Sequence, residues 1–388
     1  MSLARSTKFG INIDMIRSHD LYLYDKTTGR HILDFFGMYA SLPLGYNHEI
    51  FNSLKFRNEY LNFSSVKINN CEFVSDETIE FDRMFTEYAG QGIYKNIHYT
   101  CTGALAIEAA IKTCIIHKNG IPKTPMILTF HNSFHGINSY GGFITSRFPG
   151  ANERLKEFPE IFSKKINANL EEVEEHFKNN DYTCLLVEPI QCSAGDIYHD
   201  KIFFKSLRKL CDEYNVPLVF DEIQIGFGTT GNLWYFQGLE IIPDIVVFGK
   251  KTQVSGIMVK NELSRIFNRE LSGKLEVTWD GDVSDMIRCK YIIRAYERDE
   301  ILKNVQKRSD ELVSGLSTIE EITNLRNCGL IVGFDLPNSC ERDIFVRRAY
   351  KNGLMCNSTS NKAVRLRPSL TLTSDHITQC VEILKKRK

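Results

Sequence analysis

The chain has 388 residues, enough to bury several cores, and this length excludes the small disulfide-bonded scaffolds. Its 48 Lys and Arg balance 48 Asp and Glu, so no excess charge is available to attract nucleic-acid backbones or anionic membranes. Hydrophobic residues make up 43% and charged residues 25% of the chain, which is typical of a folded globular protein and excludes a disordered or collagen-like one.

Eleven cysteines are scattered along the chain without a CxxC pair, a pattern that favours neither a disulfide framework nor a structural zinc site. The first twenty residues mix basic and acidic side chains and lack the apolar stretch of a signal peptide. No run of about 18 apolar residues, the minimum for a membrane-spanning helix, occurs anywhere. We therefore expect a cytoplasmic protein that binds neither nucleic acid nor membranes and holds no metal.

The first predicted elements form a β-hairpin. The alternating run Leu21–Tyr24 and the run His31–Phe36 flank Asp25–Gly29, whose composition is typical of a turn. From about residue 90 to residue 255, short β-branched runs alternate with helical stretches. This alternation predicts an α/β fold with a largely parallel sheet that helices cover.

The C-terminal part has a different pattern. A helix-forming stretch over Val283–Leu316 precedes an alternating region that ends in Ala363–Pro368 and a final helix. We interpret this part as a smaller α+β domain. The predicted boundaries give an N-terminal segment over residues 1–55, a large domain over 56–285 and a small domain over 286–388.

Five predicted strands of the middle region run directly into polar or glycine-rich residues. They are Asn96–Thr100, Met126–Phe130, Cys184–Glu188, Val216–Asp221 and Asp244–Phe248. Ligands bind at the carboxyl edge of such sheets, so the residues after these strands are the first candidates for a site.

Two of these strand ends carry groups suited to covalent chemistry. At the end of one strand, Asp221 provides a carboxylate and Gln224 an amide. A carboxylate at this place could hold a cationic ring. Lys250 follows the next strand and offers an amine suited to Schiff-base formation. Lys251 competes with Lys250 for this role, and ordinary exposed lysines after a strand are the structural alternative.

Three further strand ends are compatible with ligand binding and with an ordinary structural role. The loop Thr102–Ala104 opens a predicted helix over Leu105–His117, whose N-terminus could bind a phosphate or simply be capped. Phe134 could stack on a planar cofactor or belong to the core. The Glu188 carboxylate could face the site or be paired structurally.

Three other stretches only imitate known motifs. Gly226–Gly231 matches GxGxxG, but bulky residues follow where a nucleotide-binding helix needs small ones, so we expect a loop. Gly249–Thr252 lacks the upstream glycine and the Ser or Thr after the first lysine of a P-loop. His131 and His135 lack the intervening Glu of the HExxH zinc motif.

Taken together, these residues resemble the class III pyridoxal-phosphate aminotransferases, and most of all the L-lysine ε-aminotransferase branch. The resemblance covers about residues 20–385 and is carried by Leu33–Phe36, Leu44–His48, Thr102–Ala104, Phe134–Gly136, Glu188–Gln191, Phe220–Gln224, Gly249–Gly256, Val277–Trp279 and Arg365–Leu370. It implies pyridoxal 5'-phosphate as cofactor and PLP fold type I, which is the aspartate-aminotransferase-like fold. In that fold, helices flank the mostly parallel mixed sheet of a large domain, and the C-terminal part and N-terminal segment form a smaller α+β domain.

The resemblance also implies residue roles. Lys250 would hold the cofactor as a Schiff base and move the substrate proton, Asp221 would pair with the pyridine nitrogen, and Gln224 would contact the ring hydroxyl. Lys251 ranks well below Lys250 for the Schiff base, because Lys250 aligns with the family's single Gly-Lys. Phe134 would stack on the ring, and the remaining implied cofactor contacts are those of Thr102, Gly103, Ala104, His135 and Glu188. Thr278 resembles a threonine that reaches the cofactor phosphate of a neighbouring subunit, so we expect a homodimer with shared active sites.

Two residues that the family uses for substrate recognition are replaced. The Arg that usually follows the Phe-His-Gly motif and grips a carboxylate is Ile137, and the Glu that masks or frees the C-terminal Arg is Ser193. Arg365, and after it Arg367 on the same strand face, remain as candidate partners of a substrate carboxylate. Pairing with a nearby acid is their structural alternative. We therefore expect an aminotransferase with a changed substrate, whose amine or aldehyde is remote from any carboxylate.

Other functions stay open at this point. The same cofactor and fold support other reactions, such as aminomutation or decarboxylation. A non-catalytic relative that acts as a scaffold is a second alternative. A nucleotide-binding protein is a third, and it rests only on the two glycine motifs set aside above.

Overall fold

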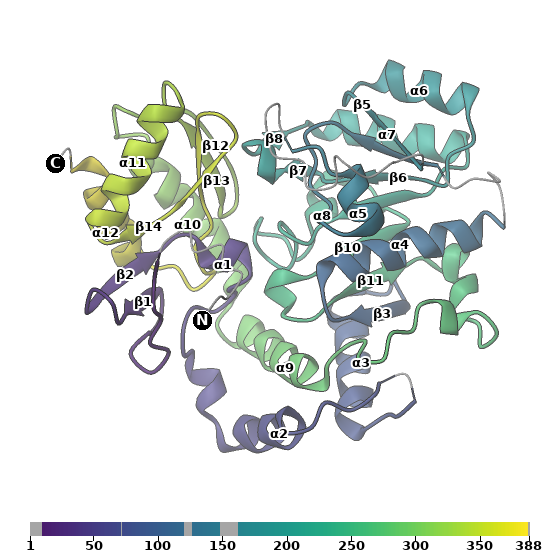
Figure 1. The fold of residues 1–388 in the computed structure, drawn as a ribbon, viewed down its shortest axis with the longest axis horizontal. Coiled ribbons are helices and arrows are strands. Elements are labelled where there is room, and N and C mark those ends of the chain that lie inside the picture. The colour runs from purple at the N-terminus through teal and green to yellow at the C-terminus, as the bar shows by residue number, and fades with distance from the viewer. Residues whose placement is uncertain (1–9, 71, 120–125, 148–161, 387–388) are drawn as a thin grey trace.

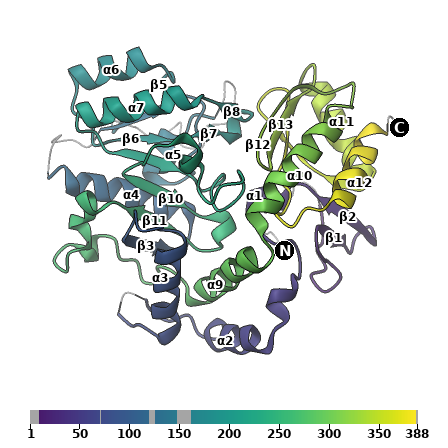
Figure 2. The ribbon, with the colours of Figure 1, turned by 180° about the vertical axis from the view of Figure 1, so that it is seen from behind.

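The computed structural model describes residues 10–70, 72–119, 126–147 and 162–386. They form two bodies that lie side by side, each built on its own sheet (Figure 1). In the view from behind, α9 (Val283–Arg298) and α2 (Leu54–Ser64), which pack on each other, lie below both bodies (Figure 2).

Seven strands form the sheet of the larger body. In spatial order they are β3 (Asn96–Thr100), β11 (Ser255–Val259), β10 (Ile245–Phe248), β9 (Leu218–Asp221), β6 (Cys184–Val187), β4 (Ile127–Phe130) and β5 (Ser163–Ile166). All run in the same direction except β11, which pairs antiparallel with both β10 and β3. The five strands predicted from the sequence are therefore present and share one carboxyl edge, which confirms the expected α/β fold.

Helices cover both faces of this sheet because successive side chains of a strand point to opposite sides. Phe220 of β9 packs on Phe204 of α7 (Lys201–Glu213), and their ring centroids are 5.6 Å apart. Val219 and Val247 belong to the separate core on the other face, together with the buried side of α4 (Gly103–His117). With both faces buried, the carboxyl edge is the part of the sheet that is open to a ligand.

The smaller body contains an antiparallel sheet in the order β12 (Thr323–Cys328), β13 (Ile331–Asp335), β16 (Ala363–Leu366) and β15 (Asn357–Thr359). It also contains α10 (Ile301–Leu316), α11 (Ser339–Lys351) and the expected final helix, α12 (Ser374–Lys385). The predicted hairpin is present as β1 (Tyr22–Asp25) and β2 (Arg30–Asp34). Because β14 (Leu354–Met355) pairs with β2, the N-terminal segment joins the C-terminal part, while the exact domain boundaries stay predictions.

The helical stretch expected over Val283–Leu316 is divided into α9 and α10. The break lies at Asp299 and Glu300, and Glu300 adopts the left-handed φ of 49°, which cannot continue a right-handed helix. On one side of the break, α9 packs on α2 and on α3 (Asp76–Tyr88), and on the other side α10 packs on α12. The chain therefore passes from one body to the other at this turn.

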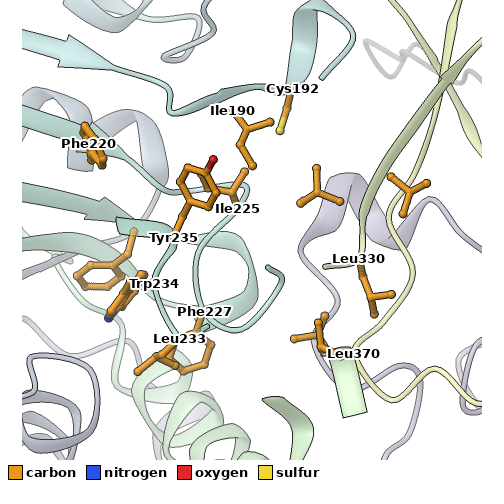
Figure 3. Packing of buried hydrophobic residues seen from close by; sticks show 14 of the residues in the cluster. Ile190, Cys192, Phe220, Ile225, Phe227, Leu233, Trp234, Tyr235, Leu330 and Leu370 are labelled. Atoms are coloured by element: carbon orange, nitrogen blue, oxygen red, sulfur yellow. The ribbon is translucent and has the colours of Figure 1, made fainter. Parts of the chain in front are cut away.

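Apolar residues fill the junction between the two bodies. Figure 3 shows Ile190, Ile225 and Tyr235 of the larger body, with Leu330 and Leu370 of the smaller body opposite them. All five belong to one continuous buried cluster. The junction is therefore part of the hydrophobic core, and it limits how freely the two bodies can separate.

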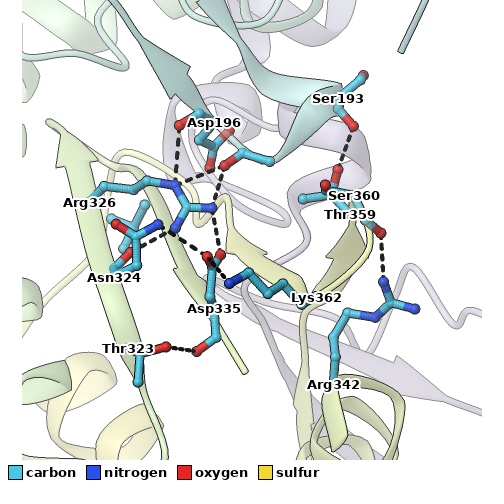
Figure 4. A network of polar contacts seen from close by, with 12 residues as sticks. Ser193, Asp196, Thr323, Asn324, Arg326, Asp335, Arg342, Thr359, Ser360 and Lys362 are labelled. Carbon is cyan, nitrogen blue, oxygen red and sulfur yellow. Dashed lines mark hydrogen bonds and ion pairs between the residues drawn. The ribbon is translucent and has the colours of Figure 1, made fainter. Parts of the chain in front are cut away.

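A polar network continues this junction (Figure 4). Arg326 of β12 donates to the Gly195 carbonyl at 2.8 Å and pairs with Asp335 at 2.9 Å. The Thr359 hydroxyl of β15 donates to the Ser193 carbonyl at 2.7 Å. The loop between β7 (Ile190–Gln191) and β8 (Ile197–Tyr198) is thereby fixed to the smaller body.

Candidate active site

The strand ends of the larger body enclose a cavity of about 480 Å³ against residues of the smaller body. This volume is in the range of small-molecule sites. The predicted residues that line it are Gly103, Ala104, Phe134, His135, Ile137, Glu188, Ser193, Asp221, Gln224, Lys250 and Arg365. The fold therefore brings most of the sequence-predicted candidates to one place.

The two neighbouring lysines after β10 have different surroundings. Lys250 lines the cavity, where burial and, secondly, the Arg365 guanidinium lower the pKa of its amine to about 8. Lys251 is only 1% exposed, and its amine donates to the Ala40 carbonyl at 2.7 Å. Of the two lysines, Lys250 is the one that lines the cavity.

The Asp221 carboxylate, at the end of β9, is held from two sides. Its Oδ2 lies 2.9 Å from His135 Nδ1, and its Oδ1 accepts a hydrogen bond from the Ile223 N–H at 3.1 Å. The second ring nitrogen of His135 lies 3.3 Å from the Thr129 hydroxyl, so the imidazole is fixed at both nitrogens. His135 therefore orients the carboxylate that the sequence places at this strand end.

The buried Glu188, after β6, holds two loops together. One of its carboxylate oxygens accepts from the Phe134 N–H at 3.0 Å, and the other accepts from the Cys192 N–H at 3.1 Å. Burial, helped by the neighbouring Asp221 carboxylate, raises the pKa of Glu188 to about 8. The sequence left open whether the Glu188 carboxylate faces the site or is paired structurally. In the structure Glu188 lines the cavity and also fixes the loop that carries Phe134.

The N-terminus of α4 approaches the same cavity. Thr102 caps the helix, because its hydroxyl accepts from the Leu105 N–H at 3.4 Å, and Gly103 and Ala104 line the cavity. A Cβ atom on Gly103 would lie 2.9 Å from the end of the Ile223 side chain, so the helix end packs closely against the loop that follows β9. A helix N-terminus placed in this way is suited to bind a phosphate.

Arg365 and Arg367 follow each other on β16 and just after it, with different partners. Arg365 lines the cavity and donates to the Cys192 carbonyl at 3.2 Å, and no carboxylate in the described part of the chain pairs with it. Arg367 is 2% exposed, pairs with Asp196 and donates to Gln224 Oε1 at 3.4 Å. Of these two arginines, Arg365 is therefore the one that lines the cavity, and pairing with an acid describes Arg367.

Three of the predicted residues, Thr102, Thr278 and Arg367, do not line the cavity. Thr278 is exposed on the larger body. The loop Gly226–Gly231 packs against Tyr296 and Leu302 at Gly228, away from the cavity lining.

Among the described residues, no group of His, Cys, Asp or Glu is arranged to hold a metal ion. No described helix has the length and apolar character needed to cross a membrane.

Sequence reasoning missed five residues of the lining, which are Tyr39, Gly136, Arg147, Ile223 and Ile225. Ile223 was within reach, because it lies between Asp221 and Gln224 at a strand end already singled out. Tyr39 comes from the N-terminal segment, and Arg147 follows α5 (Ser139–Ile144) without any recognisable motif. Only the folded chain brings these two side chains to the cavity.

Comparison with known proteins agrees with this geometry. Residues 4–387 match the family model described as Aminotransferase class-III. The chain belongs to the class III aminotransferases. This aminotransferase is 30% identical to the L-lysine-epsilon aminotransferase of Amycolatopsis lactamdurans, over 97% of this chain and 91% of the relative. It is 26% identical to the probable mitochondrial 4-aminobutyrate aminotransferase of Caenorhabditis elegans, over 98% and 89% of the two chains.

Solved structures give the same result. The lysine aminotransferase from Mycobacterium tuberculosis, in the internal aldimine form, superposes with a TM-score of 0.92. It is 28% identical to this aminotransferase, and the match covers 99% of this chain and 95% of the other. The expected enzyme class and the aminotransferase fold are therefore confirmed.

Class III aminotransferases use pyridoxal phosphate, and the residues of this cavity fit that cofactor. A desolvated amine at Lys250 suits its aldehyde, and the carboxylate of Asp221 suits its pyridine nitrogen. The helix end at Gly103 suits its phosphate. The expected cofactor is therefore confirmed by the family and matched by the chemistry of the cavity.

Proposed function

We propose that this aminotransferase transfers a terminal or side-chain amine between an amino donor and an oxo acid or aldehyde, and that its substrate differs from that of the L-lysine ε-aminotransferases. The observation that carries this proposal is the lining of the cavity, which includes Ile137, Ser193 and Arg365. Arg365 has no carboxylate partner among the described residues, so its guanidinium is available to a substrate carboxylate. Ile137 adds apolar surface on which a carbon chain can pack.

The proton-moving groups are Lys250 and Asp221. The cofactor, when bound, supplies an electron sink that makes the substrate carbon next to the amine acidic. Lys250 Nζ accepts the proton from that carbon, and its lowered pKa keeps much of the amine neutral near pH 8. Asp221, oriented by His135, keeps the pyridine nitrogen protonated.

The remaining residues position the cofactor. We assign Phe134 to stacking on its ring and Gln224 to its ring hydroxyl, and both side chains line the cavity. Thr102, Gly103 and Ala104 are assigned to the phosphate through the N-terminus of α4. Glu188 supports this arrangement, because it holds the backbone at Phe134.

We further propose a homodimer in which Thr278 reaches the phosphate site of the partner subunit. Thr278 is exposed and does not line the cavity of its own chain. Trp279, next to Thr278 in the chain, is 49% exposed, and two other apolar side chains, Phe73 and Val74, are 65% and 78% exposed. Phe73 and Val74 share one surface hollow with the flanking residue Asp280, and a second copy of the chain is the occupant that would cover this surface.

A cytoplasmic location completes the proposal. The odd number of cysteines and the missing CxxC pairs favour a reducing compartment.

The absorption spectrum of the purified protein tests the catalytic assignment, before and after a panel of amino donors that includes L-lysine, L-glutamate and 6-aminohexanoate. We expect a band near the visible edge from the cofactor attached to Lys250, and its conversion by at least one donor. The variant Lys250→Ala should lose the band. Lys251→Met is the matched control and should keep it, because the Lys251 amine lies outside the cavity.

The outcomes separate the alternatives. If wild-type protein incubated with the cofactor shows no band, the role of Lys250 is wrong and a non-catalytic scaffold takes its place. If L-lysine is the best donor, the changed substrate is wrong although the enzyme class stands. Product analysis then distinguishes amine transfer from aminomutation or decarboxylation, because only transfer requires a second substrate that accepts the amine.

A further inference from the structure

A short left-handed turn delivers Tyr39 to the cavity. In α1 (Gly37–Ala40), four successive residues have positive φ, with 55° at Gly37, 51° at Met38, 59° at Tyr39 and 69° at Ala40. Non-glycine residues avoid this conformation, so three in a row persist only where surrounding contacts impose it. Figure 1 shows α1 between the two bodies, and Tyr39 lines the cavity while 52% of it stays exposed.

Contacts at both ends impose this turn. At its start, Asp34 Oδ1 accepts from the N–H groups of Phe36 and Gly37 at 2.8 and 2.9 Å. At its end, Lys251 donates to the Ala40 carbonyl at 2.7 Å, and Gln253 donates to the next carbonyl, that of Ser41, at 2.5 Å. The chain that follows the cofactor lysine therefore holds the far end of the turn.

The surroundings of Lys251 indicate that this contact is its function. The side chain is 1% exposed, and within the described part of the chain Ala40 supplies the acceptor of its amine while no carboxylate pairs with it. Lysine is rarely buried without an acid, because desolvation disfavours the ammonium. Burial and the nearby Arg367 and Lys250 lower the pKa of Lys251 to about 7, and a neutral amine still donates an N–H to a carbonyl.

We propose that Lys251 is a positioning residue that clamps the left-handed turn and thereby holds Tyr39 as the substrate-contacting wall of the cavity. The proposal rests on the proposed function, because it takes the cavity as the substrate site. It gives the second lysine of the Gly-Lys-Lys run a task distinct from that of Lys250. It also makes the substrate wall depend on a residue that does not touch the substrate.

Hydrogen exchange tests the clamp without any substrate. The N–H groups of Ser41 and Leu42 donate to the Gly37 carbonyl at 2.8 and 3.1 Å, so they report whether the turn is formed. In Lys251→Met we expect these amides to exchange at least tenfold faster than in wild type. The matched control is Lys112→Met, which removes another lysine-to-carbonyl contact, to Lys274, away from the cavity lining, and should leave both rates unchanged.

Reaction with aminooxyacetate tests the role of Tyr39. This small amine-bearing carboxylate reacts with pyridoxal phosphate whatever the natural donor, and the loss of cofactor absorbance gives its rate. We expect Tyr39→Ala and Lys251→Met each to change the second-order rate constant about tenfold. The double variant should equal either single variant within twofold, because both changes remove the same wall.

Three results would overturn the proposal: unchanged exchange in Lys251→Met, faster exchange with an unchanged aminooxyacetate rate, or additive effects in the double variant. If Lys251→Met does not fold, Gln253→Leu loosens the same end of the turn and is read in the same way. A wild-type protein without a cofactor band would instead contradict the proposed function. The exchange measurement still decides the clamp in that case.

Discussion

At the scale of single residues, the neighbours of each group decide its chemistry. Asp221, Glu188 and Lys250 share one cavity, yet burial and partners make them different. Asp221 has His135 against one oxygen, whereas Glu188 accepts two backbone N–H groups and has a pKa raised to about 8 by burial. The sequence places all three at strand ends or just after them, but it does not contain these partners in any local motif.

The pH dependence of cofactor binding follows from the surroundings of Lys250. Its neutral amine attacks the aldehyde, so the rate of cofactor capture by cofactor-free protein should rise up to about pH 8 and level off above it. Arg365 disfavours the ammonium form, so Arg365→Met should raise the pKa and move the midpoint to higher pH. Stopped-flow absorbance measures the midpoint, and the exposed Arg347→Met is the control. An unchanged midpoint in Arg365→Met would contradict this electrostatic explanation.

At the scale of secondary-structure elements, β11 differs from the rest of its sheet. It lies between β10 and β3 and runs antiparallel to both. It is also the first strand after Lys250 in the chain. Gly256 of β11 faces Phe248 on one side and lies against the His98 carbonyl on the other. A side chain at this position would push the strand away from both neighbours.

We therefore expect Gly256→Ala to lower the free energy of unfolding by about 1–3 kcal/mol, the usual cost of overpacking a core. The added Cβ atom would lie 2.6 Å from the Phe248 ring and would also collide with the His98 carbonyl. Urea unfolding followed by circular dichroism measures the change. Gly273→Ala is the matched control, because the nearest atom to its Cβ is the flexible Glu276 carboxylate at 3.8 Å. Equal stability of the two variants would show that β11 can shift without cost.

At the scale of the whole molecule, the cavity is assembled from parts that lie far apart in the sequence. Tyr39 comes from the N-terminal segment, Lys250 from the larger body and Arg365 from the smaller one. The buried junction and the network around Arg326 hold these parts together. The proposed dimer adds Thr278 of the partner subunit to each cavity.

Mixed dimers test this sharing. When a Lys250→Ala chain and a Thr278→Ala chain are co-expressed with different tags, one cavity of each mixed dimer should carry both changes and the other cavity neither. Spectroscopic titration with pyridoxal phosphate should then find one wild-type site per dimer. Thr278→Ala homodimers should bind about tenfold more weakly, as the loss of one charge-assisted hydrogen bond predicts. Weak binding at every site of the mixed dimer would place Thr278 in its own subunit's cavity.

The sequence by itself determined the α/β fold class and the strand ends, because apolar periodicity and the residues next to strand ends are local features of the chain. The resemblance of its motifs to a known family indicated the class III aminotransferases, and most of the residues singled out in this way line the cavity. The resemblance ranked Lys250 ahead of Lys251 and Arg365 ahead of Arg367, and the tertiary structure alone supplied their surroundings. Lys250 and Arg365 line the cavity, whereas Lys251 donates to the Ala40 carbonyl and Arg367 pairs with Asp196. The tertiary structure also brought in Tyr39. These surroundings depend on which way a side chain points and on partners up to hundreds of residues away, and only packing of the whole chain sets them.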